Sequence, residues 1–159
     1  MKKGSTIPTA IFHGITDGCA YTKGKRNERL ISEGTGAYVK CINVGLPIVG
    51  NLLDNFHSIA QKACMKITQD ENFDGEFNIL GFSQGGLIGR YIVENCEMKG
   101  TVRNFVTLGT PHMGVNFVPY CPPGKNVLCD WLNKVSKYLV YFSFVQEWIA
   151  PAGYFRDLN

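Results

Sequence analysis

The sequence predicts an α/β fold with a mostly parallel central sheet flanked by helices. Two observations predict it: four short runs rich in β-branched and aromatic residues recur along the chain, and helical or polar stretches separate them. Strands that alternate with helices are typical of a parallel sheet joined by right-handed crossovers. The expected strands lie at residues 8–13, 37–44, 77–80 and 102–108.

Helical periodicity marks two of the connections between these strands. Between the second and third strands, apolar residues recur at the spacing of one helix face: Phe56, Ile59, Ala60, Ala63, Cys64 and Ile67. Asp54 stands where the N-cap of that helix belongs. After the third strand, a second apolar stripe runs as far as Glu94 and predicts a helix that follows a glycine-rich turn.

The character of the chain changes at Pro119. Residues 119–124 are typical of a loop, and residues 130–149 are rich in aromatic and apolar residues with helical spacing. We therefore expect residues 1–159 to form a single partial domain, in which residues 119–159 are an insertion or cap segment over the sheet. From Pro151 onward the sequence shows no closing helix and no capping element.

Composition bounds the class of protein. A chain of 159 residues with 45% hydrophobic composition is long enough to bury one core. The net charge of +3 is small and spread out, so we expect no nucleic-acid partner, and the basic cluster at residues 23–29 is expected to face solvent. No window reaches the ~20 apolar residues of a membrane span, and the first residues lack a signal-peptide pattern, so any leader is expected to be absent from this chain. Six cysteines permit a disulfide framework without proving one.

The string Gly81-Phe-Ser-Gln-Gly85 fits the Gly-x-Ser-x-Gly nucleophile elbow of α/β-hydrolases. A serine on a strained strand-to-helix turn needs neighbours without side chains, because the helix packs closely against the strand. The turn also brings the backbone N–H of Gln84 to a helix N-terminus, where negative charge is favoured. Ser83 is therefore the candidate nucleophile, and the alternative is a tight turn without chemistry.

A second oxyanion donor is expected directly after the first strand. There His13-Gly-Ile15 occupies the place where α/β-hydrolases supply a backbone amide, so the N–H of Ile15 is the candidate. His13 itself is expected to be a packed turn residue, because the base of this fold comes late in the chain. His112 is expected to shape the loop after the fourth strand, and His57 to lie on the surface. Attack by a serine hydroxyl requires no metal ion or cofactor, and we expect neither.

Several strings resemble the lysosomal palmitoyl-protein thioesterases: residues 12–19, Leu80-Gly-Phe-Ser-Gln-Gly-Gly86, Cys121-Pro-Pro-Gly ending at Cys129-Asp130, and residues 154–157. The similarity runs over nearly the whole chain. It implies an α/β-hydrolase that removes long-chain fatty acyl groups from cysteine residues of proteins, with S-acylated proteins and acyl thioesters as substrates. It also implies that Ser83 is the nucleophile and that Ile15 and Gln84 supply the oxyanion amides.

The resemblance also implies two disulfides, Cys64–Cys96 and Cys121–Cys129, and hence the lysosome or the secretory pathway. Each could contribute about 2–4 kcal/mol. Cys19 and Cys41 are unassigned by the resemblance. Cys41, on a strand expected to be buried, is predicted to be an ordinary apolar core residue.

The members of the family continue beyond residue 159, and their later half supplies the aspartate and histidine of the triad. We therefore expect the fold to be incomplete on the C-terminal side, with an open edge at strand 102–108 and little activity in this chain alone. Two alternatives stay open: a lipase or lysophospholipase on the same fold, and an inactive truncated product. Residues 138–144 are expected either to line an acyl groove or to cover the sheet as helix core.

Overall fold

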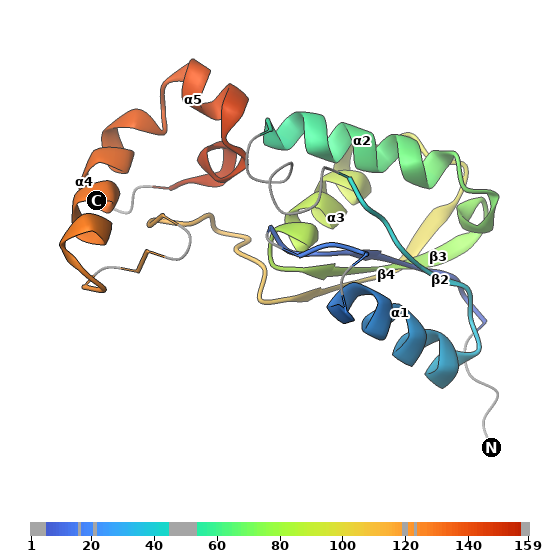
Figure 1. Ribbon diagram of the computed structural model, residues 1–159. Helices are drawn as coiled ribbons and strands as arrows, with labels where there is room; N and C mark the ends of the chain where they lie inside the picture. Colours follow the sequence, from blue (N-terminus) through green and yellow to red (C-terminus); the bar gives the residue numbers. More distant parts are fainter. Residues whose placement is uncertain are drawn as a thin grey trace.

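The computed structural model describes residues 6–15, 17–20, 22–44, 54–118, 121–122 and 124–156. Its centre is a four-stranded sheet in the order β2-β1-β3-β4 (Figure 1). The strands are β1 (Thr9–Phe12), β2 (Val39–Cys41), β3 (Glu76–Phe82) and β4 (Thr101–Leu108). All three strand pairs are parallel, which confirms the predicted strands and the predicted type of sheet.

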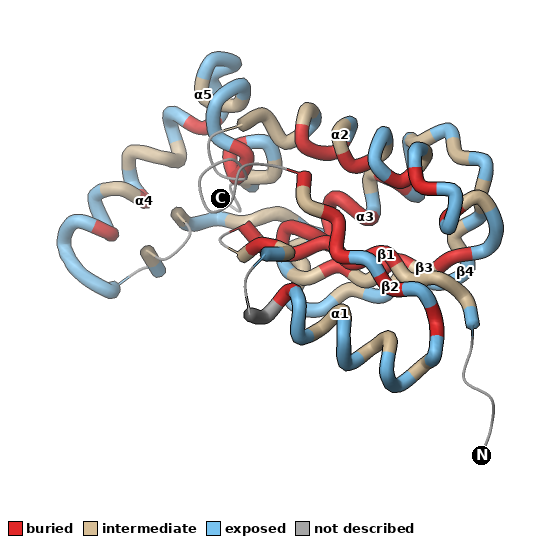
Figure 2. Tube along the Cα trace, turned by 45° about the vertical axis from the view of Figure 1, so that its right-hand side comes forward, coloured by how far each residue is buried: buried red, intermediate tan, exposed pale blue. Residues whose placement is uncertain are grey.

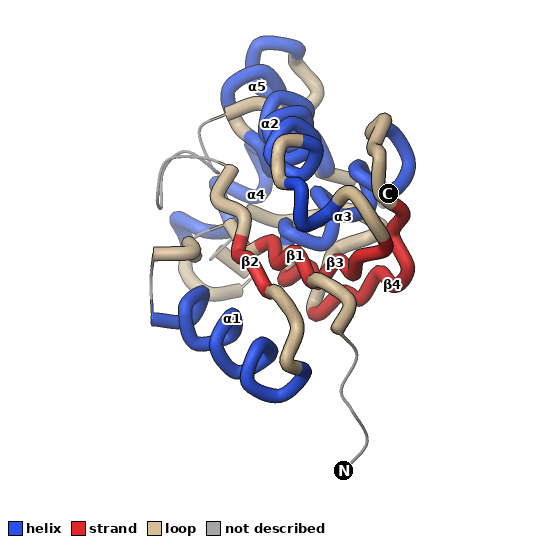
Figure 3. The backbone as a smooth tube through the Cα atoms, turned by 90° about the vertical axis from the view of Figure 1, so that its right-hand side faces the viewer, coloured by secondary structure: helices blue, strands red, loops and turns tan. Residues whose placement is uncertain are grey.

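Helices cover both faces of this sheet (Figure 3). They are α1 (Thr22–Thr35), α2 (Phe56–Thr68), α3 (Gln84–Asn95), α4 (Val127–Leu139) and α5 (Ser143–Trp148), with short 3₁₀ helices η1 (Glu71–Phe73) and η2 (Ala150–Tyr154). In the figure, α1 lies on one face and α2 and α3 lie on the other, while α4 and α5 lie to one side of the sheet (Figure 1).

Helix α1 was not expected from the sequence. Its outward side is polar and charged, and Lys25, Arg26 and Arg29 are exposed, as expected for these members of the basic cluster. Toward the sheet, Ile31 packs against a small cluster of buried residues. Gly24 permits close contact with the chain around Cys19, because a Cβ there would lie 2.8 Å from the Cys19 Cα. The helix is polar over most of its length, so its few apolar residues did not stand out in the sequence as a buried face.

The N-cap of α2 is Asn55, so the prediction of Asp54 is wrong by one residue. The Asn55 side-chain oxygen accepts hydrogen bonds from the N–H groups of His57 and Ser58, at 2.8 and 3.3 Å. These are among the first N–H groups of a helix, which have no partner within it. Asp54 instead forms an ion pair with Lys62 at 2.5 Å.

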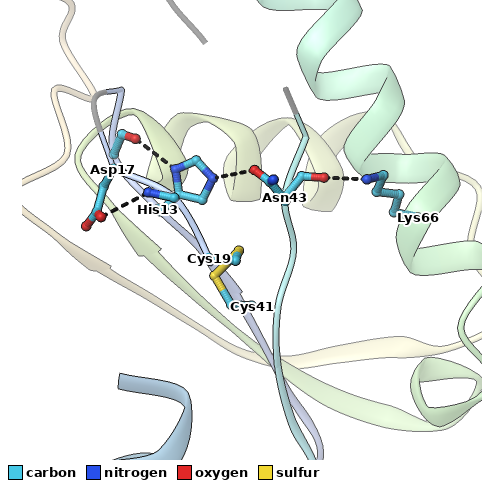
Figure 4. The surroundings of a disulfide bond; sticks show 8 residues. His13, Asp17, Cys19, Cys41, Asn43 and Lys66 are labelled. Carbon is cyan, nitrogen blue, oxygen red and sulfur yellow. Dashed lines mark hydrogen bonds between the residues drawn. A yellow bond between two sulfur atoms is a disulfide. The ribbon is translucent and has the colours of Figure 1, made fainter. Parts of the chain in front are cut away.

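The main core lies between the sheet and the helices α2 and α3, where the buried residues gather (Figure 2). Side chains alternate along the strands, so that Ala10 and Phe12 join this core while Ile11 and Cys41 face the side of α1. The prediction that Cys41 is an ordinary core residue is wrong, because it forms a disulfide with Cys19 (Figure 4).

The other four described cysteines form two further disulfides. Cys64 of α2 is bonded to Cys96 at the end of α3, and Cys121 is bonded to Cys129 of α4. Every cysteine in the described part of the chain is therefore paired. Such bonds persist in oxidising compartments.

Strand β4 is the edge of the sheet among the described residues, and nothing in that part of the chain pairs with its outer side. Val106 and Leu108 are about half exposed there. In contrast, the end of the chain is more ordered than predicted. Helix η2 buries Ala150, Pro151 and Ala152, and Phe155 forms a β-bridge to Val115. In the part of the chain that the structure covers, no helix is long and apolar enough to cross a bilayer.

Candidate active site

Ser83 lies at a strained turn between β3 and α3. Its backbone has φ 50° and ψ −122°, and it is the one non-glycine residue with positive φ among those the structure describes. Such a conformation costs about 1–3 kcal/mol and is concentrated at functional sites. Ser83 occupies the N-cap position of α3, but its side chain makes no capping hydrogen bond and the residue is exposed. The hydroxyl is therefore presented outward, as a nucleophile requires.

Two glycines allow this turn to form. A Cβ on Gly81 would lie 2.6 Å from the Gly86 nitrogen, and a Cβ on Gly85 would lie 2.7 Å from the His13 carbonyl oxygen. Both distances are shorter than real Cβ contacts, so any larger residue would push α3 away from the ends of β1 and β3. The Gly-x-Ser-x-Gly spacing is thus required by the packing of the first turn of α3.

The loop after β1 lies directly beside the serine. A Cβ placed on Gly14 would be 3.4 Å from the Ser83 Cβ and 3.9 Å from its Oγ. Ile15 follows Gly14 and is buried, and Gln84 begins α3 and is almost wholly buried. The first N–H groups of a helix lack partners within it and favour negative charge. The structure thus brings the two segments that carry the candidate oxyanion donors to Ser83.

His13 is a packed turn residue, as predicted. It is almost wholly buried, and both ring nitrogens are occupied: Nδ1 lies 2.9 Å from the Gly14 carbonyl oxygen and Nε2 lies 3.2 Å from the Asn43 side-chain oxygen (Figure 4). Asn43 is fixed in turn by Lys66, whose Nζ donates to the Asn43 carbonyl at 2.5 Å. Both ring nitrogens are thus engaged, and neither is hydrogen-bonded to Ser83.

The other two histidines bond to residues close to them in the sequence. His112 is exposed, with Nε2 3.1 Å from the Thr107 Oγ1 and its ring edge-on to Phe105 at 6.4 Å. His57 is exposed on α2 and lies 3.0 Å from the Gln61 side chain. Among the described residues, no imidazole is hydrogen-bonded to Ser83.

An apolar pocket opens among α4, α5, η2 and the segment before α4. Its volume is about 390 Å³, within the usual range for small-molecule sites. The lining is Phe117, Val118, Leu132, Val135, Ser136, Leu139, Val140, Val145, Ile149, Pro151, Ala152 and Phe155. Of residues 138–144, Leu139 and Val140 line it, whereas Phe142 and Phe144 do not and are more than half exposed.

A profile of the palmitoyl protein thioesterase family matches residues 8–159. This chain belongs to the palmitoyl protein thioesterase family. Its fold agrees with that assignment, because the structure resembles an extracellular α/β-hydrolase from a Paenibacillus species, with a TM-score of 0.55 at 15% identity over 84% of this chain and 51% of that one. The family is one of hydrolases, and the fold is of the α/β-hydrolase type.

Three curated relatives show how much of the family this chain represents. Palmitoyl-protein thioesterase 1 of Caenorhabditis elegans is 28% identical, with 96% of this chain and 53% of that protein covered. The palmitoyl-protein thioesterase-dolichyl pyrophosphate phosphatase fusion 1 of Schizosaccharomyces pombe is 29% identical, with 94% and 25% covered. Palmitoyl-protein thioesterase 3 of Dictyostelium discoideum is 24% identical, with 96% and 50% covered. The chain thus spans a quarter to about half of the length of these relatives.

Within this family member, Tyr154 contacts the elbow, a role that the sequence did not reveal. Its hydroxyl is hydrogen-bonded to the side chain of Gln84, and its ring packs edge-on against Phe56 with centroids 5.6 Å apart. Burial raises the pKa of the Tyr154 hydroxyl, and the hydrogen bond from Gln84 lowers it by less. The phenol is therefore neutral at any physiological pH. The Tyr154-Phe-Arg-Asp string carries part of the resemblance, but nothing in the sequence links it to Gln84.

A polar network lies at the opposite ends of the strands from Ser83. Lys40 Nζ donates to the Asp70 Oδ2 at 2.6 Å, and the Tyr38 hydroxyl donates to the same oxygen at 3.1 Å. Burial raises the pKa of Asp70, but hydrogen bonds from Lys40, Asn72 and Tyr38 outweigh it and bring the pKa down to about 2. This network joins β2 to Asp70, the N-cap of η1, and lies at the other end of the strands from the elbow.

Proposed function

We propose that this chain is the nucleophile-bearing part of a serine hydrolase that removes palmitate and other long-chain fatty acyl groups from S-acylated cysteines. One observation carries the proposal. In a member of this family, Ser83 sits at a strained turn with its hydroxyl unused, beside the Gly14–Ile15 loop.

In the first step, the Ser83 Oγ attacks the thioester carbonyl carbon and forms a bond to it. The hydroxyl proton passes to a general base and then to the departing sulfur, which leaves as the cysteine thiol. The negative charge on the carbonyl oxygen is held by the N–H groups of Ile15 and Gln84. Water then attacks the acyl-enzyme, which releases the fatty acid and restores the serine.

Among the described residues, no general base is hydrogen-bonded to Ser83. None of the described histidines bonds to Ser83, and the resemblance places the triad aspartate and histidine in the later half of the longer family members. A serine without its base is a weak nucleophile. We therefore propose that these residues alone turn over substrate very slowly.

The apolar pocket supports an acyl-chain site in the proposed cap segment, residues 119–159. Its lining is almost wholly hydrocarbon, which suits a long alkyl chain and excludes a charged or sugar ligand. Within residues 138–144, Leu139 and Val140 line this pocket, so they are the side chains expected to affect acyl-chain length. The Leu139→Trp and Val140→Phe variants are expected to shift the preference toward shorter acyl groups.

A lipase or lysophospholipase is the second candidate. The same pocket would hold the chain of an oxygen ester, because it contacts the hydrocarbon and not the bond that is cleaved. The ratio of kcat/KM on a palmitoyl-cysteine peptide to that on a matched oxygen ester decides between them, measured on a version extended to the length of the relatives. A ratio below one favours the lipase.

Labelling by a fluorophosphonate probe tests the nucleophile. We expect Ser83→Ala to abolish labelling of the extended version, and Ser143→Ala, a matched exposed serine, to leave it unchanged. The 159-residue chain should label at least about a thousandfold more slowly than the extended version, because its serine lacks a base. Equal rates would show that a base exists within these residues. The His112→Ala variant would then identify it.

The disulfides support an oxidising location, and we propose the lysosome or the secretory pathway. Mass spectrometry of a non-reduced digest of protein from its native source should find Cys64 with Cys96 and Cys121 with Cys129. Free thiols at these positions would contradict the proposed compartment.

A further inference from the structure

The helices α4 and α5 and the turn between them carry a concentration of exposed aromatic side chains. We define the aromatic surface by Trp131, Tyr138, Tyr141, Phe142, Phe144 and Trp148. Trp131 is 57% exposed, Tyr138 is 73% and Trp148 is 69%. Exposed apolar groups of this size mark an interaction site when they gather on one segment. Figure 2 shows the exposed stretches of α4 and α5 at the periphery, away from the buried core.

This surface is distinct from the apolar pocket. On α4, Leu132, Val135 and Leu139 line the pocket, whereas Trp131 and Tyr138 do not. Trp131 and Tyr138 are seven residues apart, which places them on one side of the helix. On α5, Val145 and Ile149 line the pocket. The aromatic residues of α5 fall at a helical spacing of four, at Phe144 and Trp148, and both are exposed.

The charges of this region favour an anionic partner. Four basic and two acidic residues lie between 124 and 156: Lys125, Lys134, Lys137 and Arg156, with Asp130 and Glu147. Helical spacing puts Lys134 on the same side of α4 as Trp131 and Tyr138. Asp130 accepts a hydrogen bond from the Gly124 N–H, which partly satisfies its charge.

We propose that the aromatic surface docks on the anionic surface of a lipid bilayer. Tryptophan and tyrosine are the residues enriched at membrane interfaces, because their rings are apolar and carry one polar group. Lysine stems lie along apolar surface while the ammonium group meets lipid headgroups. Docking in this way would bring the neighbouring apolar pocket to the lipid interface. The proposal does not require the proposed function, since lipid binding is measured without turnover.

The chain contains its own reporters for this binding. Its two tryptophans are Trp131 and Trp148, and both belong to the aromatic surface. Adding vesicles of phosphatidylcholine with about 30% phosphatidylserine should move the tryptophan emission to shorter wavelength. Lipids brominated on the acyl chain should quench it. Trp131→Phe and Trp148→Phe each leave a single reporter, and both single-tryptophan forms should respond.

Sedimentation with the same vesicles measures affinity. The double variant Tyr138→Ser/Phe144→Ser keeps both tryptophans and should bind at least about tenfold more weakly, because two exposed aromatic groups are lost. Lys134→Glu should reduce binding about tenfold on phosphatidylserine vesicles and little on pure phosphatidylcholine. The matched control is Leu30→Ser/Met65→Ser, which removes exposed apolar side chains from α1 and α2 and should bind normally. Circular dichroism verifies that each variant is folded.

Three results would overturn the proposal. One is unchanged emission of both tryptophans on phosphatidylserine vesicles with folded, monomeric protein. Another is a dimer that Tyr138→Ser/Phe144→Ser dissociates, without vesicle binding, which would assign the surface to a second copy of the chain. The third is short-wavelength emission from the extended version before vesicles are added. It would show that the further residues of that version cover the surface.

Discussion

The sheet with its helices α2 and α3 and the segment of α4 and α5 hold their structure in different ways. In the first region, strands and helices share a core in which Phe77, Ile88 and Ile92 are inaccessible to solvent. In the second region, α4 buries only Cys129 and Asn133, and α5 buries no residue. Ser83 belongs to the first region and the apolar pocket to the second. The proposed nucleophile is thus fixed by a rigid core, while the proposed acyl pocket is built largely from a segment with few buried contacts.

Truncating one aromatic residue in each region tests this contrast most severely. Phe77→Ala should lower the free energy of unfolding by about 3–5 kcal/mol, because it opens a cavity in the main core. Trp148→Ala should change it by less than about 0.5 kcal/mol, since that side chain is 69% exposed. Urea denaturation with far-UV circular dichroism measures both. Equal losses would show that α5 is part of the cooperative core.

The disulfides of the two regions should differ in how much each adds to the free energy of unfolding. Cys64–Cys96 spans 32 residues and Cys121–Cys129 spans 8. Loop-closure entropy then predicts losses of about 3.7 and about 2.5 kcal/mol for the paired cysteine-to-alanine variants. Thermal unfolding of the two double variants measures these losses. If loss of Cys121–Cys129 lowers the free energy of unfolding more than loss of Cys64–Cys96, then the α4 segment contributes to global stability and not only to the structure of its own loop.

The pH dependence of unfolding should locate an ionic contribution in the sheet region. The pKa of Asp70 is about 2 in the folded protein, below its ordinary value of 3.8. This group therefore stabilises the fold at pH above its unfolded pKa, and the stabilisation is lost as the pH falls from about 4 through 2. Asp70→Asn should cost about 1–2 kcal/mol at neutral pH and flatten the stability curve in that range. A parallel loss in wild type and variant between pH 4 and 2 would exclude Asp70 as the cause. Glu147→Gln, on α5, serves as the control and should leave the curve unchanged.

The smallest expected effect concerns the contact between η2 and the elbow. Tyr154→Phe removes the hydrogen bond between η2 and the Gln84 side chain and should cost about 1 kcal/mol. The ring contact with Phe56 is kept in this variant. In the extended version the variant should also slow fluorophosphonate labelling if Tyr154 positions the elbow. Unaltered labelling together with the stability loss would limit Tyr154 to a structural role.

Sequence patterns predicted the parts of the fold whose signal is local. The four strands and the helices α2 and α3 were expected because apolar residues recur at periods that each element imposes. The serine turn was expected for the same reason, since Gly81 and Gly85 are required by contacts within a few residues of the turn and with one strand end.

The missed features depend on residues that meet only after folding. Cys19 and Cys41 are brought together because the chain after β1 returns beside β2, which no spacing in the sequence reveals. Likewise, Tyr154 reaches Gln84 from the far end of the chain. Helix α1 was missed because its sequence is mostly polar and offers few apolar residues that would mark a buried face.

The strand β1 has a mechanical consequence for the loop that follows it. Strand β1 pairs with β2 on one side, along Thr9–Ile11, and with β3 on the other, along Thr9–Phe12. Both of its edges are therefore fixed by neighbouring strands. The loop that follows β1 is attached at one end to this strand and at the other end to β2, through the Cys19–Cys41 disulfide. Ile15 therefore lies in a short loop that is fixed at both ends. Reduction of that bond would remove the covalent anchor at Cys19 and leave the loop held by β1 and by the contacts of His13.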